Sequence, residues 1–170
     1  KMIIDGRLKP YSYPITVGSN ITTGVSNTTK ILACFRSKDT VKNILASLSL
    51  FQFTVFNPSK DTLVTIQMVG GITSTGGSWS DINSGSGLEI NKTAISYTGG
   101  LPKITLYSYA TTSHGVNSQG STPSNIDAEL LGLSITENQE FAIVATTTTV
   151  GSTASIAWSV NWIEKNTTYY

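Results

Sequence analysis

Residues 154–164, close to the end of the chain, alternate between apolar and small side chains. The apolar set is Ala154, Ile156, Trp158, Val160 and Trp162, and the other set is Ser155, Ala157, Ser159 and Asn161. Successive side chains of a β-strand point to opposite faces, so this pattern predicts a long strand with one apolar, aromatic face. Each Trp side chain would bury about 200 Å². We therefore expect this face to be buried, either in the core of a sandwich or in a contact that holds an oligomer together.

Shorter runs of alternating or β-branched residues recur along the rest of the chain. Strands are predicted at residues 13–17, 30–35, 48–56, 62–69, 88–90, 93–97, 103–109 and 140–146. Asn57, Pro58 and Asp61 favour a turn, so residues 51–69 are predicted to form a hairpin. The glycine pair at residues 70–71 is predicted to lie in a loop, and the pair at 99–100 to end a strand.

Four apolar residues before the predicted hairpin follow helical spacing, which allows at most one helical turn there. They are Val41, Ile44, Leu45 and Leu48. Short strands with a turn about every 8 to 12 residues predict an all-β protein, an antiparallel β-sandwich of jelly-roll-like form. A chain of 170 residues suits one domain. We expect residues 1–18 to form an extended lead-in and residues 19–170 to form a single β-sandwich domain.

The composition argues against two classes of partner. Charged residues make up 12% of the chain and the formal net charge is +1, which gives no electrostatic footprint for nucleic acid. No apolar run approaches the thickness of a bilayer, and residues 1–6 do not resemble a signal peptide. We therefore expect neither nucleic-acid binding nor membrane insertion.

The residues that usually carry chemistry are sparse. Cys34 is the only cysteine, so no internal disulfide can form, and its apolar neighbours predict a buried small hydrophobe. His114 is the only histidine, and the chain contains no nucleophile elbow that it could serve as a base. One His and one Cys exclude the usual zinc sites. We therefore expect no catalytic residue, no metal and no cofactor.

Two further patterns have a structural and a functional interpretation. Residues 81–89 begin like a calcium loop, but the later ligands are missing and Lys92 stands at the last position, so a turn-rich connection fits better. Tyr107 and Tyr109 share one strand face. They fit packing against a neighbouring strand better than a stacking platform for sugar, although both interpretations remain open.

Two loops rich in Gly, Ser and Asn are the predicted places for partner contact. They cover residues 70–87 and 111–125, and the second has a length that is often functional in a compact domain. The candidate contact residues are Trp79 in the first loop and His114, Asn117 and Gln119 in the second.

Three segments together resemble a family of virion surface proteins. They are GSWSD at residues 77–81, GLEINKTAISYTGG at 87–100, and ASIAWSVNWIE at 154–164. Residues 51–164 resemble the β-sandwich head domains at the C-termini of phage and large-virus fibre or decoration proteins. The resemblance implies a jelly-roll-like head at the virion surface. It also implies a homotrimer that is attached through its N-terminal side to a shaft or capsid, and it brings no catalytic residues.

The sequence therefore predicts a non-enzymatic viral structural protein, either a fibre head or a capsid decoration. Its expected partners are two further copies of itself, other virion proteins, and a host surface receptor or glycan. Two alternatives remain. One is a carbohydrate-binding module or adhesin domain of a bacterial surface protein, which should show exposed aromatic side chains. The other is a sandwich-fold glycan hydrolase.

Overall fold

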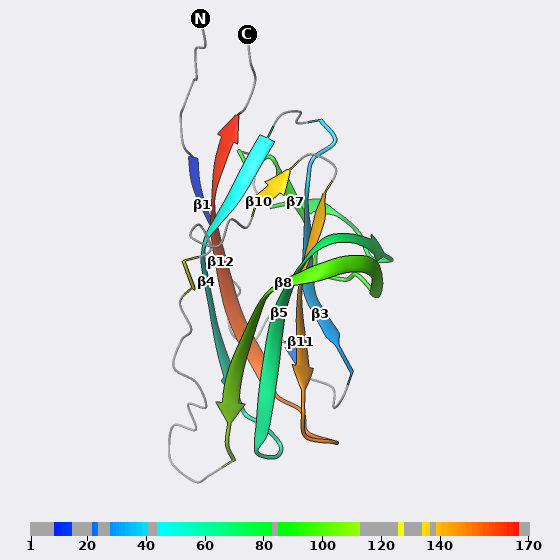
Figure 1. The fold of residues 1–170 in the computed structure, drawn as a ribbon, viewed down its shortest axis with the longest axis vertical. Coiled ribbons are helices and arrows are strands. Elements are labelled where there is room, and N and C mark those ends of the chain that lie inside the picture. The colour runs from blue at the N-terminus through cyan, green and yellow to red at the C-terminus, as the bar shows by residue number, and fades with distance from the viewer. Residues whose placement is uncertain are drawn as a thin grey trace, which may run out of the picture.

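The computed structural model confirms the predicted fold class. It describes residues 9–14, 22–23, 28–40, 44–82, 85–112, 126–127, 134–136 and 139–166. These residues form two antiparallel sheets that pack face to face, and none of them is helical (Figure 1). Accordingly, the described residues contain no helix long and apolar enough to cross a membrane.

Twelve strands of the described chain are divided between the two sheets. The first sheet has the order β1 (Lys9–Pro14), β12 (Ser155–Asn166), β4 (Ile44–Phe56), β10 (Ser134–Thr136), with β2 (Thr22–Thr23) paired to β12 and β9 (Ile126–Asp127) paired to β4. The second sheet has the order β6 (Ser80–Asp81), β7 (Leu88–Asn91), β3 (Lys30–Ser37), β11 (Glu140–Thr147), β5 (Thr62–Thr75), β8 (Ser96–Ala110).

The pairing of the main strands is that of a jelly roll. Eight of the described strands, β1, β3, β4, β5, β8, β10, β11 and β12, form pairs that are nested along the chain, whereas β2, β6, β7 and β9 pair outside this nest. The first of the eight pairs with the last (β1 with β12), and the second pairs with the seventh (β3 with β11). Then β4 pairs with β10, and β5 with β8. This is one long hairpin rolled into two sheets, which is the double-sheet jelly roll.

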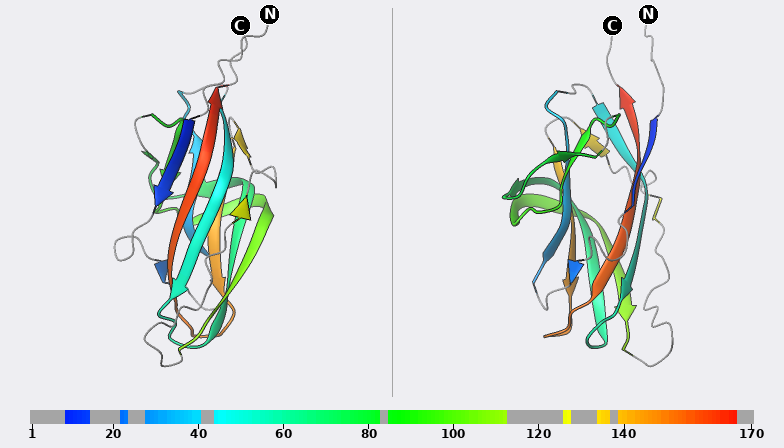
Figure 2. Two further views of the ribbon diagram at one scale, coloured as in Figure 1. Left: turned by 90° about the vertical axis from the view of Figure 1, so that its left-hand side faces the viewer. Right: turned by 180° about the vertical axis from the view of Figure 1, so that it is seen from behind.

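The apolar face of β12 lies in the core between the sheets. Ile156, Trp158, Val160 and Trp162 are at most 3% exposed, and β12 runs beside β4 across the first sheet (Figure 2). The Trp158 ring meets the Phe35 ring of the second sheet edge-on, with their centroids 6.2 Å apart. The aromatic side of the strand is therefore buried within a single chain, by the opposite sheet.

The predicted hairpin at residues 51–69 is wrong. Both strands exist, but β4 belongs to the first sheet and β5 to the second. The turn between them is present, with Asn57 at a φ of 48° and Pro58 buried, but it forms an arch from one sheet to the other. Alternation shows which face of a strand is apolar and does not identify the strand that lies beside it.

The expected helical turn is also absent from the residues that the structure describes. β4 begins at Ile44, so Ile44, Leu45 and Leu48 lie on a strand, and Val41 falls outside the described part. Ile44 and Leu45 pair with Asn166 and Lys165 of β12, as the rest of β4 does along its length. This long ladder overrides a helical spacing that covers only a few residues.

Two glycine pairs lie within strands, contrary to the expectation that they form loops or strand ends. Gly70 pairs with Leu101, and the ladder of β5 and β8 continues to Thr75 and Ser96. The φ angles of Gly71, Gly99 and Gly100 are +75°, +70° and +83°. Such backbone angles bend a strand without ending its pairing. The two strands therefore curve together out of the plane of their sheet (Figure 1). We call residues 69–75 and 96–102 the bent arm.

The bent arm gives the second sheet a small additional core on its outer face. Its buried members are Cys34, Val69, Ile72, Ala142 and Val144, and Ile31, Trp79, Ala94 and Tyr97 pack against them half-buried. β3 and β11 thus bury apolar side chains on both of their faces. The parts of β5 and β8 outside the bent arm, residues 62–68 and 103–110, contribute no residue to this outer core.

The described chain enters and leaves the sandwich at one end. Lys9, the first residue of β1, pairs with Glu164 near the end of β12. The strand predicted at residues 13–17 therefore begins earlier, within the expected lead-in. The arch at residues 57–61 and the loop at 148–153 lie at the opposite end, where the Ser59 amide donates to the Thr153 carbonyl. We call this opposite end the distal end.

We predict that two glycine substitutions in the bent arm differ in cost. Gly71→Ala places a methyl where no atom lies within 4 Å, so it adds only left-handed backbone strain, about 1–2 kcal/mol. At Gly100 the same methyl would stand 2.5 Å from Cγ2 of Ile72. Gly100→Ala should therefore cost about 1–3 kcal/mol more. Urea unfolding of both variants measures the difference, and equal costs would contradict the packing of the bent arm.

Candidate functional site

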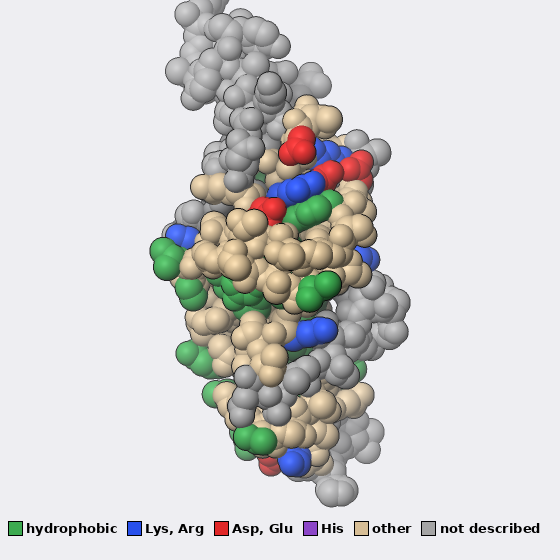
Figure 3. Space-filling view, turned by 90° about the vertical axis from the view of Figure 1, so that its right-hand side faces the viewer, with side chains coloured by type: hydrophobic (Ala, Val, Ile, Leu, Met, Phe, Trp, Pro, Cys, Tyr) green, Lys and Arg blue, Asp and Glu red, His purple; other side chains and the backbone are tan. Residues whose placement is uncertain are grey.

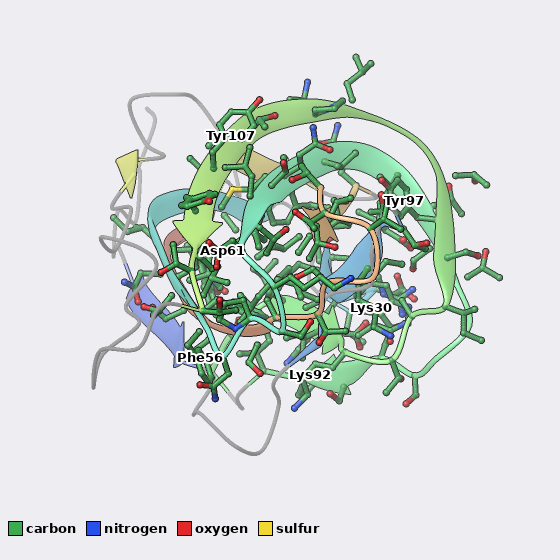
Figure 4. The ribbon with its side chains drawn as sticks, turned by 90° about the horizontal axis from the view of Figure 1, so that it is seen from below. Lys30, Phe56, Asp61, Lys92, Tyr97 and Tyr107 are labelled. Carbon is green, nitrogen blue, oxygen red and sulfur yellow. The ribbon has the colours of Figure 1, made fainter. Side chains whose placement is uncertain are left out.

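The most exposed aromatic side chains of the described chain lie on β8. Tyr107 and Tyr109 are 63% and 56% exposed, whereas Ser108 and Ala110 between and after them are buried. Figure 4 shows Tyr107 on the outer side of β8. No other described strand therefore covers the two rings, and their cross-strand partners lie on β5. β8 is an edge of the second sheet, and the bent arm covers a different part of the outer face.

The neighbours of the two rings are uncharged. On β5, Leu63 pairs with Tyr109, Thr65 with Tyr107 and Gln67 with Thr105, and all three β5 side chains are half-buried. The Gln67 amide donates to the Thr105 hydroxyl at 3.2 Å. We call these six residues the tyrosine strip: Leu63, Thr65, Gln67, Thr105, Tyr107 and Tyr109. The strip combines two exposed rings with hydroxyl and amide groups and contains no ionisable acid or base apart from the phenols.

The tyrosine strip lies next to the distal end. Tyr109 and Leu63 are one pair away from Ala110 and Thr62, where β8 and β5 meet the arch and the following loop. Hydrogen bonds fix this end: the Asp61 carboxylate accepts from the Thr112 amide at 2.7 Å and from its hydroxyl at 2.9 Å. These two bonds hold the pKa of Asp61 below its ordinary value.

A second polar feature crosses the upper part of the outer face. Acidic and basic side chains gather there in one band (Figure 3). Lys38 pairs with Asp81 at 3.0 Å, and Arg36 pairs with Glu89 at 2.9 Å. Asp81 and Glu89 are the two ends of the calcium-like segment. Each of these carboxylates therefore forms an ion pair with a basic side chain of β3 or its end. The described residues contain no group of three or more His, Cys, Asp and Glu side chains that could hold a metal ion.

Trp79, a predicted contact residue, lies beside this band. Its side chain is half-buried and packs against the outer core, and the Arg36 guanidinium stacks over the ring at 4.3 Å from its centroid. Such a cation–π contact joins the loop to β3. The other predicted contact residues, His114, Asn117 and Gln119, lie outside the described residues and stay predictions.

Glu164, which no sequence motif marks as a functional residue, is 6% exposed. Its Oε1 accepts from the Ser86 hydroxyl at 2.6 Å and from the Trp162 indole at 2.8 Å. Its Oε2 accepts from the Gly87 amide at 2.9 Å. Glu164 therefore ties the segment before β7 to the end of β12. The available signal was its place in the alternation, two residues beyond Trp162 on the apolar face.

We predict that Glu164→Gln destabilises the protein by about 1–3 kcal/mol. The carboxylate accepts three hydrogen bonds, so the NH₂ group of Gln would face a donor in either orientation. Glu89→Gln is the matched control, because its ion pair with Arg36 keeps some solvent exposure, 30% for Arg36 and 21% for Glu89, and should contribute only about 0–1 kcal/mol. Chemical denaturation of both variants compares the two costs. A Glu164→Gln variant no weaker than the control would exclude this anchoring role.

Cys34 is buried, as the sequence predicts. Burial, and then the nearby Glu140 carboxylate, raise the pKa of the thiol from 9.0 to about 12. The folded state thus keeps its proton at a pH where the unfolded state has lost it. The contribution of the protonated thiol to the free energy of unfolding is therefore complete below the unfolded pKa of 9.0. It is lost as the pH rises from 9.0 towards 12.

We predict that this alkaline loss of stability is smaller in Cys34→Ala. The variant lacks the titrating thiol, whereas Lys and Tyr titrations are common to both proteins. Urea midpoints measured between about pH 8 and pH 11 should fall more steeply for the parent than for the variant. Parallel profiles would show that the thiol does not contribute.

No protein-family model matches the chain, and no curated protein is significantly similar to it.

Proposed function

We propose that the chain is a non-enzymatic structural protein of a virion, a fibre head or capsid decoration that contacts the host surface. The support from the fold is the nested strand pairing, since the double-sheet jelly roll is an architecture of viral capsid and lectin domains. A fold alone does not imply a function. The further support comes from where the ends of the described chain and the exposed aromatic residues lie.

The observation that carries the proposal is the separation of these two features along the sandwich. β1 begins, and β12 ends, at one end, where Lys9 pairs with Glu164. The tyrosine strip lies next to the distal end, beside the arch and the loop at residues 148–153. A head attached through its N-terminal side would therefore direct the strip away from the particle. Exposed loops and faces on a rigid scaffold are where binding residues concentrate.

Four carboxyl groups of the described residues are held by structural contacts, which argues against their acting as a hydrolytic pair. A glycan hydrolase needs two carboxyl groups that flank the scissile bond. Asp81 and Glu89 form ion pairs, Asp61 accepts two hydrogen bonds from Thr112, and Glu164 is enclosed by three donors. Each of these four carboxylates has a structural partner that accounts for its position.

The proposal includes association as a homotrimer. The apolar face of β12 is used inside the chain, so the contact has to involve other surface near this strand. The opposite face of β12 offers Ser155, Ala157 and Ser159, which are half-exposed and small enough for a flat contact between sheets. Light scattering of the purified chain at micromolar concentration measures the mass, and a well-folded monomer would remove the trimer from the proposal.

Immunogold electron microscopy tests the function itself. Antibody raised against the purified chain is applied to particles and to cells from a culture of the source. We expect gold on the surface of virus particles, and pre-incubation of the antibody with the purified chain should abolish it. Gold confined to a cell envelope would overturn the proposal.

Gold confined to a cell envelope would support another function, that of a carbohydrate-binding module or adhesin domain. The exposed pair Tyr107 and Tyr109 specifically favours this alternative, because sugar-binding surfaces present aromatic side chains to solvent. The location of the protein separates the two functions, since both can include the same binding face.

A further inference from the structure

We propose that the tyrosine strip binds an uncharged glycan. This inference rests on the proposed attachment function and names the ligand class for its contact face.

The two rings form a platform on one side of a regular strand. Tyr107 and Tyr109 are two residues apart on β8, so their Cβ atoms are about 6.6 Å apart along the strand. The ladder with β5 fixes the backbone on which they stand. Tyr supplies a rigid, amphipathic contact area with little loss of conformational freedom. A sugar ring has one face of C–H groups that can lie on such a surface and hydroxyls that point sideways from it.

The neighbours of the rings match those sideways hydroxyls. Thr65 and Thr105 carry hydroxyls that can donate and accept, and Gln67 adds an amide. The six residues of the strip include no Lys, Arg, Asp or Glu. The nearest basic residue on β8 is the exposed Lys103, two positions before Thr105, so an anionic sugar or a phosphate backbone lying on the two rings would meet no cation within the strip itself. The chemistry of the strip therefore favours a neutral glycan.

The size of the strip argues against a protein as its occupant. A stable protein interface uses roughly 20–30 residues on each side and buries about 800 Å² per partner. The strip as defined has six residues. The ion-paired side chains of the charged band, Arg36, Lys38, Asp81 and Glu89, lie on other strands and do not extend it. A small ligand instead needs a few aromatic groups and a few convergent polar groups.

The test measures binding of soluble neutral polysaccharides by affinity electrophoresis, with a panel of glucans, mannans and galactans as the probes. We expect at least one of them to bind the folded chain. Tyr107→Ala and Tyr109→Ala should each weaken that binding by roughly tenfold, as for a central aromatic contact. Tyr107→Phe and Tyr109→Phe keep the rings and should retain most of it.

Leu101→Ala is the matched control, because Leu101 is a 67% exposed apolar residue of the same strand outside the strip. It should leave glycan binding unchanged. Circular dichroism and urea midpoints confirm that each variant is folded. Binding that survives both Tyr→Ala changes, or no binding across the panel, would each overturn the inference.

The outcomes also separate this inference from the proposed function. Gold-labelled particles without any glycan binding would leave a virion protein with a different receptor. Tyrosine-dependent glycan binding by a protein found in a cell envelope would keep the strip and remove the virion assignment.

Discussion

The packing of β12 against the second sheet is the contact on which the rest of the fold depends. Trp158 meets Phe35 across the core, and Trp162 is buried while its indole anchors the Glu164 carboxylate. β12 is the last described strand, yet it pairs with the first strand, β1, and along the whole of β4. The first sheet is therefore incomplete until residues from both ends of the chain come together. Such long-range pairing is the costly step in forming all-β proteins, because loop closure precedes the contacts that reward it.

The bend in β5 and β8 determines which part of the second sheet stays open. Gly71, Gly99 and Gly100 let both strands turn while their ladder continues, so the bent arm covers the outer side of Cys34 and its neighbours. That cover raises the pKa of the thiol by removing it from water. Below the bend the same outer face carries Tyr107 and Tyr109 in the open. The bend at these glycines thus produces both a buried outer core and an exposed aromatic surface on a single pair of strands.

The sequence predicts local features of this structure well and long-range features poorly. The strands at residues 30–35, 103–109 and 140–146, the turn after Phe56 and the burial of Cys34 follow from alternation and turn chemistry. The strand that pairs with each of them does not follow from these patterns. The segment at 51–69 is therefore predicted as a hairpin, whereas it forms an arch between the two sheets. Glycine pairs inside strands look like strand ends, because their need for positive φ is the same in a loop and in a bend. The exposure of the two tyrosines depends on which part of the outer face the bent arm covers, which alternation alone does not specify.

Five charged side chains hold segments of the described chain in place. Arg36 and Lys38 neutralise Glu89 and Asp81 across β3, β6 and β7, and Glu164 fastens residues 86–87 to β12. The tyrosine strip, which lies beyond the bend, contains none of them. An interaction at the strip therefore depends on ring contact and on short hydrogen bonds. Salt screens such contacts far less than it screens exposed ion pairs. A face of this kind would keep its affinity for a ligand over a wide range of ionic strength.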